Sequence, residues 1–167
     1  IDESWKISEN GMVYTFKIRK GVTFASGNPL TADDVVYSLQ RVVILDKSPA
    51  FILTQFGFTP ENVKETIKKI DDFTVEITID KPYAPTFFLY CLTSTVGSVI
   101  DMKEVQAHEK DGDMGYNWLK TAYAGSGPYM LKSWKPSETL IYERNDNYWG
   151  EKAKMKRIIT RHIAESA

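Results

Sequence analysis

The sequence predicts an α+β fold in which a few helices pack on mixed or antiparallel sheets. Three pairs of segments alternate apolar and polar residues, and a short turn joins the members of each pair, which indicates three β-hairpins. Hairpins combined with a few helices are not typical of a repeated βαβ winding. The sequence contains no internal repeat at a period of about 20 to 50 residues.

The first hairpin is predicted near the start of the chain. Residues 13–19 alternate in polarity, so that Tyr14, Phe16 and Ile18 share one face of a half-buried strand. An Asn-Gly pair just before this strand has the chemistry of a tight turn, because glycine tolerates positive φ and asparagine comes nearest to matching it. We therefore expect residues 5–7 to form the other strand.

Residues 32–43 are predicted to form a helix. Thr31 can cap it, and Asp34 stands three residues later, as in a capping box. A second helix start is predicted at residues 59–62, where proline takes the first helical position. The apolar side chains that recur at helical spacing in the first of these helices are Val35, Val36, Leu39, Val42 and Val43.

The middle of the chain predicts a second hairpin and a buried helix. Residues 66–70 and 74–79 form the two strands, and two aspartates between them supply the turn. Residues 84–90 begin with a proline that a helix accepts and are apolar nearly all round, so we expect a short buried helix. Small residues over 93–98 then suit a crossing between two packed units.

The last third predicts a polar helix and the third hairpin. The helix is expected from about residue 102 to 110, and a glycine-containing loop follows it. A turn at 125–128 leads into a strand over 129–134, which a second turn connects to a strand over 139–144.

Composition limits the class of protein. The chain has 167 residues, which permits one domain or two small ones, and its 43% hydrophobic and 26% charged residues are ordinary for a folded soluble domain. With 21 basic and 22 acidic side chains and no basic run, no nucleic-acid partner is expected. No apolar stretch approaches the roughly 20 residues that span a bilayer. Residues 1–5 have no signal-peptide pattern and resemble the interior of a longer protein.

Residues that could carry catalysis or hold a metal are not arranged for it. His108 and His162 stand far apart in the sequence, and neither has the spacing of a zinc or di-iron motif. Cys91, the single cysteine, lies in an apolar run that should raise its pKa and cannot form an intramolecular disulfide. We therefore predict no enzyme, no cofactor and no metal site.

Two further patterns have structural explanations. The Asp-Gly-Asp at 111–113 opens like a calcium loop, but the later ligand positions hold glycine and alanine. The Gly-Ser-Gly at 125–127 lacks the Lys-Ser/Thr of a phosphate-binding loop, and proline follows it. The first is interpreted as a solvated loop and the second as a tight turn.

Four stretches carry a resemblance to a known family. Residues 5–24 (WKISENGMVYTFKIRKGVTF) and 26–38 (SGNPLTADDVVYS) resemble consecutive motifs of the family 5 extracellular solute-binding proteins, which serve ABC importers of peptides, nickel and some sugars. Residues 125–131 (GSGPYML) and 143–150 (ERNDNYWG) resemble the later motifs "GTGPYxL" and "ERNxxYWG". The motifs stand in the order typical of the family.

This resemblance implies that the chain is an internal fragment of a larger two-lobed fold, of the type II periplasmic-binding-protein class. Residues 1–96 would be a small subdomain beside the first lobe, and residues 97–167 would belong to the first lobe. The second lobe would be absent from this chain. Because ligand lies between the lobes in such proteins, the chain should hold one wall of the binding site.

The resemblance also implies the function. The parent protein would be the extracytoplasmic solute-binding component of an ABC importer that captures di- or oligopeptides, at the periplasmic or extracellular face of the envelope. Its partners would be a peptide or small-molecule ligand and the importer's membrane subunits, and a parent lipid anchor would be its other link to the membrane. Nickel chelates and oligosaccharides remain alternatives, as do a hydrolase with catalytic residues elsewhere and a reused sensory domain.

The residues expected to contact ligand follow from the same resemblance. One segment, just after the predicted buried helix, matches the region from which the family extends side chains toward ligand. Two residues outside that segment are weaker candidates, Tyr90 and Ser126. The residues of the segment itself are Thr93, Ser94, Thr95 and Val96.

Overall fold

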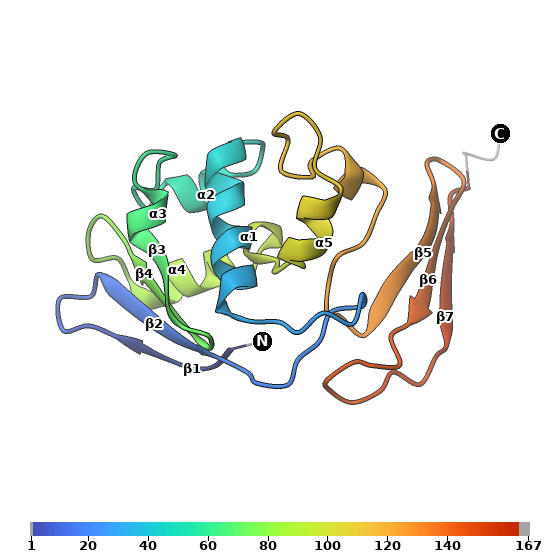
Figure 1. The fold of residues 1–167 in the computed structure, drawn as a ribbon, viewed down its shortest axis with the longest axis horizontal. Helices are drawn as coiled ribbons and strands as arrows, with labels where there is room; N and C mark the ends of the chain where they lie inside the picture. The colour runs from blue at the N-terminus through green and yellow to red at the C-terminus, as the bar shows by residue number, and fades with distance from the viewer. Residues whose placement is uncertain (1, 164–167) are drawn as a thin grey trace.

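A computed structural model describes residues 2–163 and shows two antiparallel sheets with the helices gathered on one of them (Figure 1). The first sheet has the strand order β1-β2-β4-β3, and the second has the order β5-β6-β7. This arrangement confirms the predicted α+β class with antiparallel sheets built from hairpins. The strands are β1 (Asp2–Ile7), β2 (Val13–Ile18), β3 (Ile67–Asp71), β4 (Thr74–Thr78), β5 (Tyr129–Lys135), β6 (Thr139–Arg144) and β7 (Arg157–Arg161).

The helices pack mainly on the first sheet, and in the sequence they form two groups, one between β2 and β3 and one between β4 and β5. The longest is α1 (Ala32–Leu45), which lies against β3 and β4. No helix within the described residues is both long enough and apolar enough to cross a bilayer. The shorter ones are α2 (Phe51–Thr54), α3 (Val63–Thr66), α4 (Pro85–Leu92), η1 (Thr95–Gly97), α5 (Met102–Ala107) and η2 (Trp118–Lys120).

All three predicted hairpins are present. In the first sheet, β2 pairs with both β1 and β4, and Tyr14 stands opposite Ile77 while Phe16 stands opposite Val75. These four side chains are buried, as the alternation of the sequence predicts. In the third hairpin β5 pairs with β6, and the sequence analysis did not predict β7, which adds to the free edge of β6.

The core lies between the first sheet and the helices. Val35, Leu39 and Val43 of α1 are buried, which confirms the helical spacing seen in the sequence. Phe88 of α4 is fully buried and lies with its ring centroid 4.6 Å from that of Tyr14. Burying a side chain of this size contributes about 1.5–3 kcal/mol.

The expectation that residues 84–90 form a short buried helix is wrong as to its burial. The segment is helical as α4, with proline at its start, but Phe88 is its only buried residue. Phe87 is 43% exposed and Tyr90 is 73% exposed. The physical reason is that α4 meets the core on the side of Phe88, while its other side is only partly covered, with Phe87 packing on Phe56 at a centroid distance of 5.3 Å.

Two other helices differ from the prediction, one in where it begins and one in where it ends. The helix expected to begin with Pro60 is the single turn α3, because the Asn62 side chain accepts a hydrogen bond from the Thr59 N–H and donates one to the Gly57 carbonyl. These bonds form a turn up to residue 62. The helix expected over 102–110 is α5, which ends at Ala107.

Two buried carboxylates connect α1, α5 and the loop at residues 26–28. Asp34 is 5% exposed and accepts hydrogen bonds from the backbone N–H groups of Thr31 at 2.9 Å and Met102 at 3.0 Å. Asp101 is 1% exposed and accepts from the Ser26 hydroxyl, from the Asn28 amide at 2.8 Å and from the N–H of Glu104.

Backbone hydrogen bonds continue this junction toward the second sheet. The Asp101 N–H donates to the Ala124 carbonyl at 2.9 Å, and the Ala25 N–H donates to the Gly125 carbonyl at 3.0 Å. Nearby, the Arg19 guanidinium lies 5.0 Å from the ring centroid of Trp149. None of the strand residues of the second sheet is buried against the described part of the chain.

The division into residues 1–96 and 97–167 stays a prediction, since it concerns the lobes of a longer protein. Within this chain, α5 belongs to the same packed unit as α1. The Ile100 N–H donates to the Ser38 hydroxyl at 2.9 Å, and the Ser38 hydroxyl donates to the Asp34 carbonyl. The sparser connection comes after Ala124, where the chain enters the second sheet (Figure 1).

Asp34→Ala should destabilise the chain by about 1–3 kcal/mol, because it leaves the N–H groups of Thr31 and Met102 without an acceptor. Urea unfolding followed by circular dichroism measures the change. The matched control is Asp33→Ala, one residue away, whose half-exposed carboxylate pairs with Lys69. Equal losses of stability for the two variants would contradict the assignment of Asp34 to the junction.

Candidate functional site

The titratable groups of the described residues do not converge on one reacting position. Among residues 2–163, no group of three or more His, Cys, Asp and Glu side chains is arranged to hold a metal ion. The ring of His108 stacks on Trp118 at a centroid distance of 4.3 Å, and its Nδ1 lies 2.8 Å from the Glu104 carbonyl oxygen. His162 is exposed just after β7. The two histidines therefore lie on different parts of the fold.

Cys91 has the environment that the sequence predicts. It lies in α4, is partly buried, and burial raises the pKa of its thiol. The side chain of Gln55 is its neighbour, with Nε2 3.8 Å from Sγ. Because the thiolate is the nucleophilic form, a raised pKa makes this thiol less reactive near neutral pH.

The loop at 111–115 uses its aspartate to organise the backbone. The Asp113 carboxylate accepts hydrogen bonds from the N–H groups of Lys110, Gly115 and Asn117, at 2.9 to 3.1 Å. These bonds also lower the pKa of Asp113. Its oxygens are thus engaged within the loop, and Gly115 packs closely on Val105 of α5.

Two of the predicted ligand-facing residues, Thr95 and Val96, line a cavity of about 180 Å³. Its wall combines the end of α1, the segment that follows α1, the turn η1 and the loop before η2. Thr95 is exposed and Val96 is buried, so they offer the cavity a hydroxyl-bearing and an apolar side chain. The other lining residues are Arg41, Val42, Leu45, Lys47, Ser48, Pro49 and Tyr116.

This cavity carries positive charge. Arg41 projects from α1, and its Nε donates a hydrogen bond to the Met114 carbonyl at 2.7 Å. Lys47 lies over the ring of Tyr116, with Nζ 5.7 Å from the centroid. Lys120 approaches the same ring at 4.8 Å. The described lining residues include two cations and no carboxylate.

Glycine at position 97 allows η1 to close against α4. A Cβ at this position would lie 1.9 Å from the Leu92 carbonyl oxygen, which belongs to the backbone and cannot rotate away. The same short segment carries hydroxyls that bond back to α4. Those of Thr93 and Ser94 donate to the carbonyls of Tyr90 at 2.7 Å and Cys91 at 2.6 Å. The wall at residues 93–97 is therefore fixed to the end of α4.

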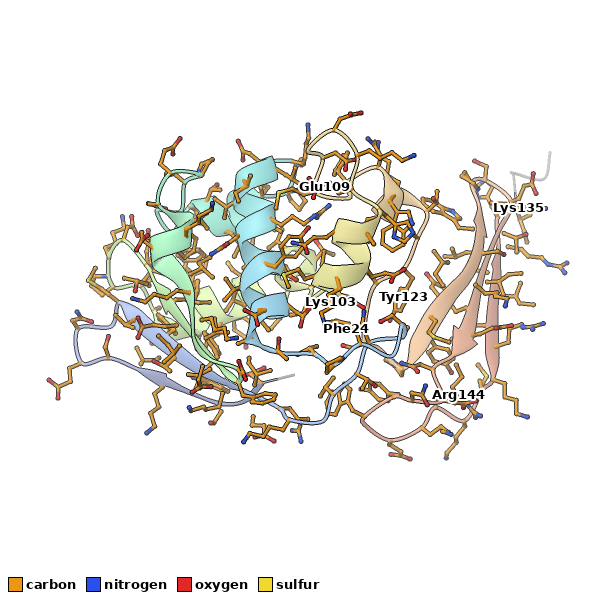
Figure 2. All side chains as sticks on the ribbon, in the orientation of Figure 1. Phe24, Lys103, Glu109, Tyr123, Lys135 and Arg144 are labelled. Atoms are coloured by element: carbon orange, nitrogen blue, oxygen red, sulfur yellow. The ribbon has the colours of Figure 1, made fainter. Side chains whose placement is uncertain are left out.

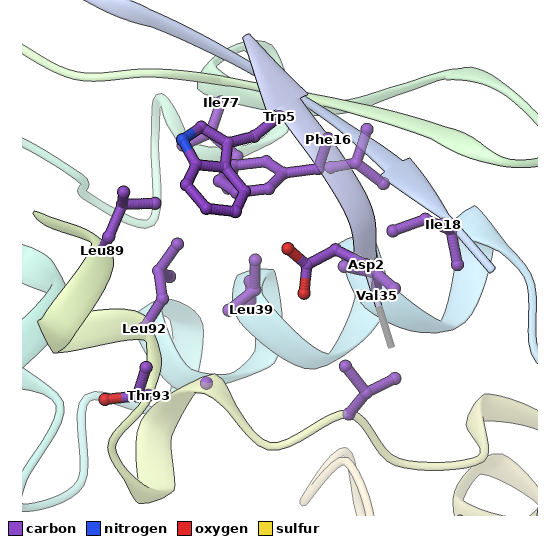
Figure 3. A pocket seen from close by; sticks show the side chains of 13 residues that line it. Asp2, Trp5, Phe16, Ile18, Val35, Leu39, Ile77, Leu89, Leu92 and Thr93 are labelled. Carbon is purple, nitrogen blue, oxygen red and sulfur yellow. The ribbon is translucent and has the colours of Figure 1, made fainter. Parts of the chain in front are cut away.

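Thr93 faces a different, larger cavity. This second cavity has a volume of about 320 Å³ and lies between the first sheet, α1 and α4 (Figure 3). Its wall is mostly apolar, and Trp5 stands over it while remaining 50% exposed. Asp2 is the one charged residue that lines it among those described.

The remaining predicted residues do not line the 180 Å³ cavity that contains Arg41 and Lys47, called the cationic cavity below. Ser94 adjoins Thr95 in sequence, and Tyr90 is highly exposed on α4. Ser126 is buried in the turn before β5, next to Tyr123, whose hydroxyl accepts a hydrogen bond from the Gly127 N–H at 3.1 Å. Figure 2 shows Tyr123 on the segment that runs from α5 to the second sheet. Ser126 therefore belongs to the junction between the two sheets.

Sequence reasoning missed Arg41, Lys47 and Tyr116. They come from three separate segments, and none belongs to a motif with recognisable spacing. The one indication of this cavity in the sequence is the broken apolar stretch after α1, where a lysine and a serine precede Pro49.

Comparison with known proteins gives a consistent result over the whole chain. The model of the family described as "Bacterial extracellular solute-binding proteins, family 5 Middle" matches residues 1–167. The probable D,D-dipeptide-binding periplasmic protein DdpA of Escherichia coli is 35% identical over 164 residues, which are 98% of this chain and 30% of that protein. The periplasmic oligopeptide-binding protein OppA of Salmonella typhimurium is 32% identical over 162 residues, 89% of this chain and 28% of that protein.

Solved structures agree with this result. The periplasmic binding protein DppA of Helicobacter pylori, in complex with the peptide STSA, superposes with a TM-score of 0.75 at 29% identity, covering 97% of this chain and 33% of that one. NikZ of Campylobacter jejuni, in complex with Ni(L-His), superposes with a TM-score of 0.76 at 26% identity, covering 97% of this chain and 30% of that one. The chain thus spans about 30% of the length of the curated relatives it matches.

In the folded chain, Cys91 should be alkylated by iodoacetamide more slowly than in the urea-unfolded chain at the same pH. Burial raises the pKa of the thiol, so a smaller fraction is thiolate when the chain is folded. Mass spectrometry of the alkylated chain over time measures both rates, and the rate for the folded chain should rise at higher pH than that for the unfolded chain. A folded-state rate equal to or above the unfolded one would indicate an activated thiol and contradict this interpretation.

Proposed function

This chain belongs to the bacterial extracellular solute-binding proteins of family 5, and from this membership we propose that its protein captures di- or oligopeptides for an ABC importer. The observation that carries the proposal is the match of the family model to residues 1–167. Relatives whose names specify dipeptides and oligopeptides, and a similar structure that holds the peptide STSA, support peptide as the ligand.

The geometry of the chain supports binding over chemistry. Capture of a solute requires a concave surface with hydrogen-bonding and apolar groups, and needs no residue that breaks bonds. The cationic cavity at Thr95 and Val96 has these properties, while the histidines and Cys91 lie apart from it. The relatives compared are named as binding proteins, and we extend that role to this one.

We propose that the chain supplies one wall of the binding site. Residues 1–96 would be the small subdomain beside the first lobe, residues 97–167 would be part of that lobe, and a second lobe would close over the ligand. The named relatives are periplasmic proteins, so the protein would act at the periplasmic or extracellular face and deliver ligand to the importer's membrane subunits. A lipid anchor would be a further link to the membrane.

Within this wall, Thr95 and Val96 would contact the ligand directly, because both line the cavity. Tyr90 would serve as an exposed aromatic surface beside the wall, where peptide side chains could pack. Thr93 and Ser94 would mainly hold the segment against α4, since their hydroxyls bond to backbone carbonyls of that helix. Ser126 is the weakest of the predicted contacts, because it is buried in the junction.

A metal chelate is the second candidate ligand. The structure of NikZ in complex with Ni(L-His) resembles this chain as closely as the peptide-bound structure does. The described residues offer no cluster of metal-ligating side chains, so a chelate would be held through its organic part.

Short peptides should raise the melting temperature of this protein when it is produced at the length of its relatives. Ligand that binds only the folded state stabilises it by about 2.7 kcal/mol at a concentration of 100 Kd. A thermal-shift series with di- to pentapeptides, a nickel–histidine chelate and oligosaccharides measures the preference.

The chain of residues 1–167 alone is the control, and it should show almost no shift with any of these ligands. A shift with the chelate or a sugar and none with peptides would overturn the proposed ligand class. A clear, saturable shift with the chain alone would contradict the proposal that it supplies one wall.

A further inference from the structure

We propose that the 180 Å³ cavity binds a carboxylate of the captured ligand, with Arg41 and Lys47 as its charged partners. This inference rests on the proposed function, because it assigns a chemical group of the ligand to one wall of the site. Such a cavity would favour ligands with a free carboxylate, whether at a peptide terminus, on an acidic side chain or on a chelating acid.

Arg41 is a partly buried cation without an anionic partner. Its Nε is held by the Met114 carbonyl, and neither Nη nitrogen has a hydrogen-bond or ion-pair partner among residues 2–163. Burial disfavours the charged form and lowers the pKa of this guanidinium. A desolvated charge is expected to be compensated by an opposite charge or by hydrogen bonds. The two Nη nitrogens are thus open to an acceptor from outside these residues.

The Asp113 carboxylate is not available to fill this role. Asp113 contributes to the electrostatic environment of Arg41, but its oxygens accept hydrogen bonds from three backbone N–H groups of its own loop. It forms no ion pair with Arg41 within 4.0 Å. The loop that carries both Met114 and Asp113 therefore holds Arg41 in place and leaves its charge unpaired.

Lys47 adds a second positive charge to the same cavity. Its ammonium lies over the Tyr116 ring, and Lys120 approaches that ring as well. Lys47 lines the cavity, whereas Lys120 does not. The two lysines thus differ in access to the proposed site while sharing the contact with Tyr116, which makes them a matched pair for mutagenesis.

The size and lining of the cavity fit a carboxylate better than a whole ligand. A volume of about 180 Å³ is below the roughly 300–1,000 Å³ of pockets that enclose a small molecule. The planar fork of an arginine matches the two oxygens of a carboxylate. Ser48 and Thr95 provide hydroxyl donors at the rim, and the apolar side chains of Val42, Leu45 and Val96 lower the local dielectric.

The test compares peptides that differ only in the carboxylate, with the protein at the length of its relatives. Isothermal titration measures Kd for alanyl-tripeptides with a free C-terminus, with a C-terminal amide, and with an amidated C-terminus plus one glutamate. The variants are Arg41→Gln, Lys47→Gln and the control Lys120→Gln. Because the free C-terminus and the glutamate side chain are tested in separate peptides, the titrations identify which carboxylate the cavity binds.

Arg41→Gln should weaken binding of the carboxylate-bearing peptides about tenfold or more, and Lys47→Gln about threefold, with little change for the plain amide. Lys120→Gln should leave every Kd unchanged. If Arg41→Gln lowers the melting temperature, Lys47→Gln decides the question, because Lys47 is exposed and its ammonium has no hydrogen bond to the described residues to lose. Variants that weaken acid and amide peptides equally, or neither, would overturn the inference while peptide binding itself stands.

A second readout does not depend on peptide binding. Acetate, titrated into wild-type protein labelled with nitrogen-15, should shift the Nε–Hε resonance of Arg41 saturably, and Lys47→Gln should weaken this response. If wild-type protein binds no peptide but shows this shift, the proposed peptide function fails and the carboxylate site stands. Absence of the shift together with equal peptide affinities for all variants would overturn the carboxylate site.

Discussion

Two carboxylates removed from solvent, Asp34 and Asp101, determine how the parts of this chain meet. A buried carboxylate is tolerated only when its oxygens are satisfied, and each oxygen of both residues accepts at least one hydrogen bond. The donors come from the start of α1, the start of α5 and the loop at residues 26–28. The junction therefore fixes α5 on α1 and leads the chain to the second sheet. The cationic cavity depends on this arrangement, because the loop after α5 carries the carbonyl that holds Arg41.

Much of the fold could be predicted from the sequence because its signals are local. The alternation around Tyr14 and Phe16 requires neighbours only two residues apart, and the pair Thr31 and Asp34 indicates the start of α1 over three residues. β7 was missed because its five residues begin and end with arginine, and a long connection rather than a tight turn joins it to β6. The exposure of α4 was missed because composition alone does not show which side of a helix is covered.

The candidate site was only partly predictable for the same reason. Residues 93–96 were expected from a resemblance, and the structure places Thr95 and Val96 in a cavity while leaving Thr93 beside another. Arg41 and Tyr116 lie 75 positions apart in the chain, so only folding brings them together. A charge that lacks a partner is likewise visible only once its neighbours are known. The role proposed for Arg41 therefore depends on its Nη nitrogens, which have no hydrogen-bond or ion-pair partner among the described residues.

The proposed function requires this chain to form one wall of a ligand site, centred on the segment after α1 and the turn η1. Hydrogen–deuterium exchange, with and without saturating peptide, tests this claim most directly in the protein at the length of its relatives. We expect bound peptide to slow the exchange of the backbone N–H groups at residues 47–51 and 93–97, with little change in β5 to β7. Protection confined to other parts of the chain, or none within residues 2–163, would contradict it.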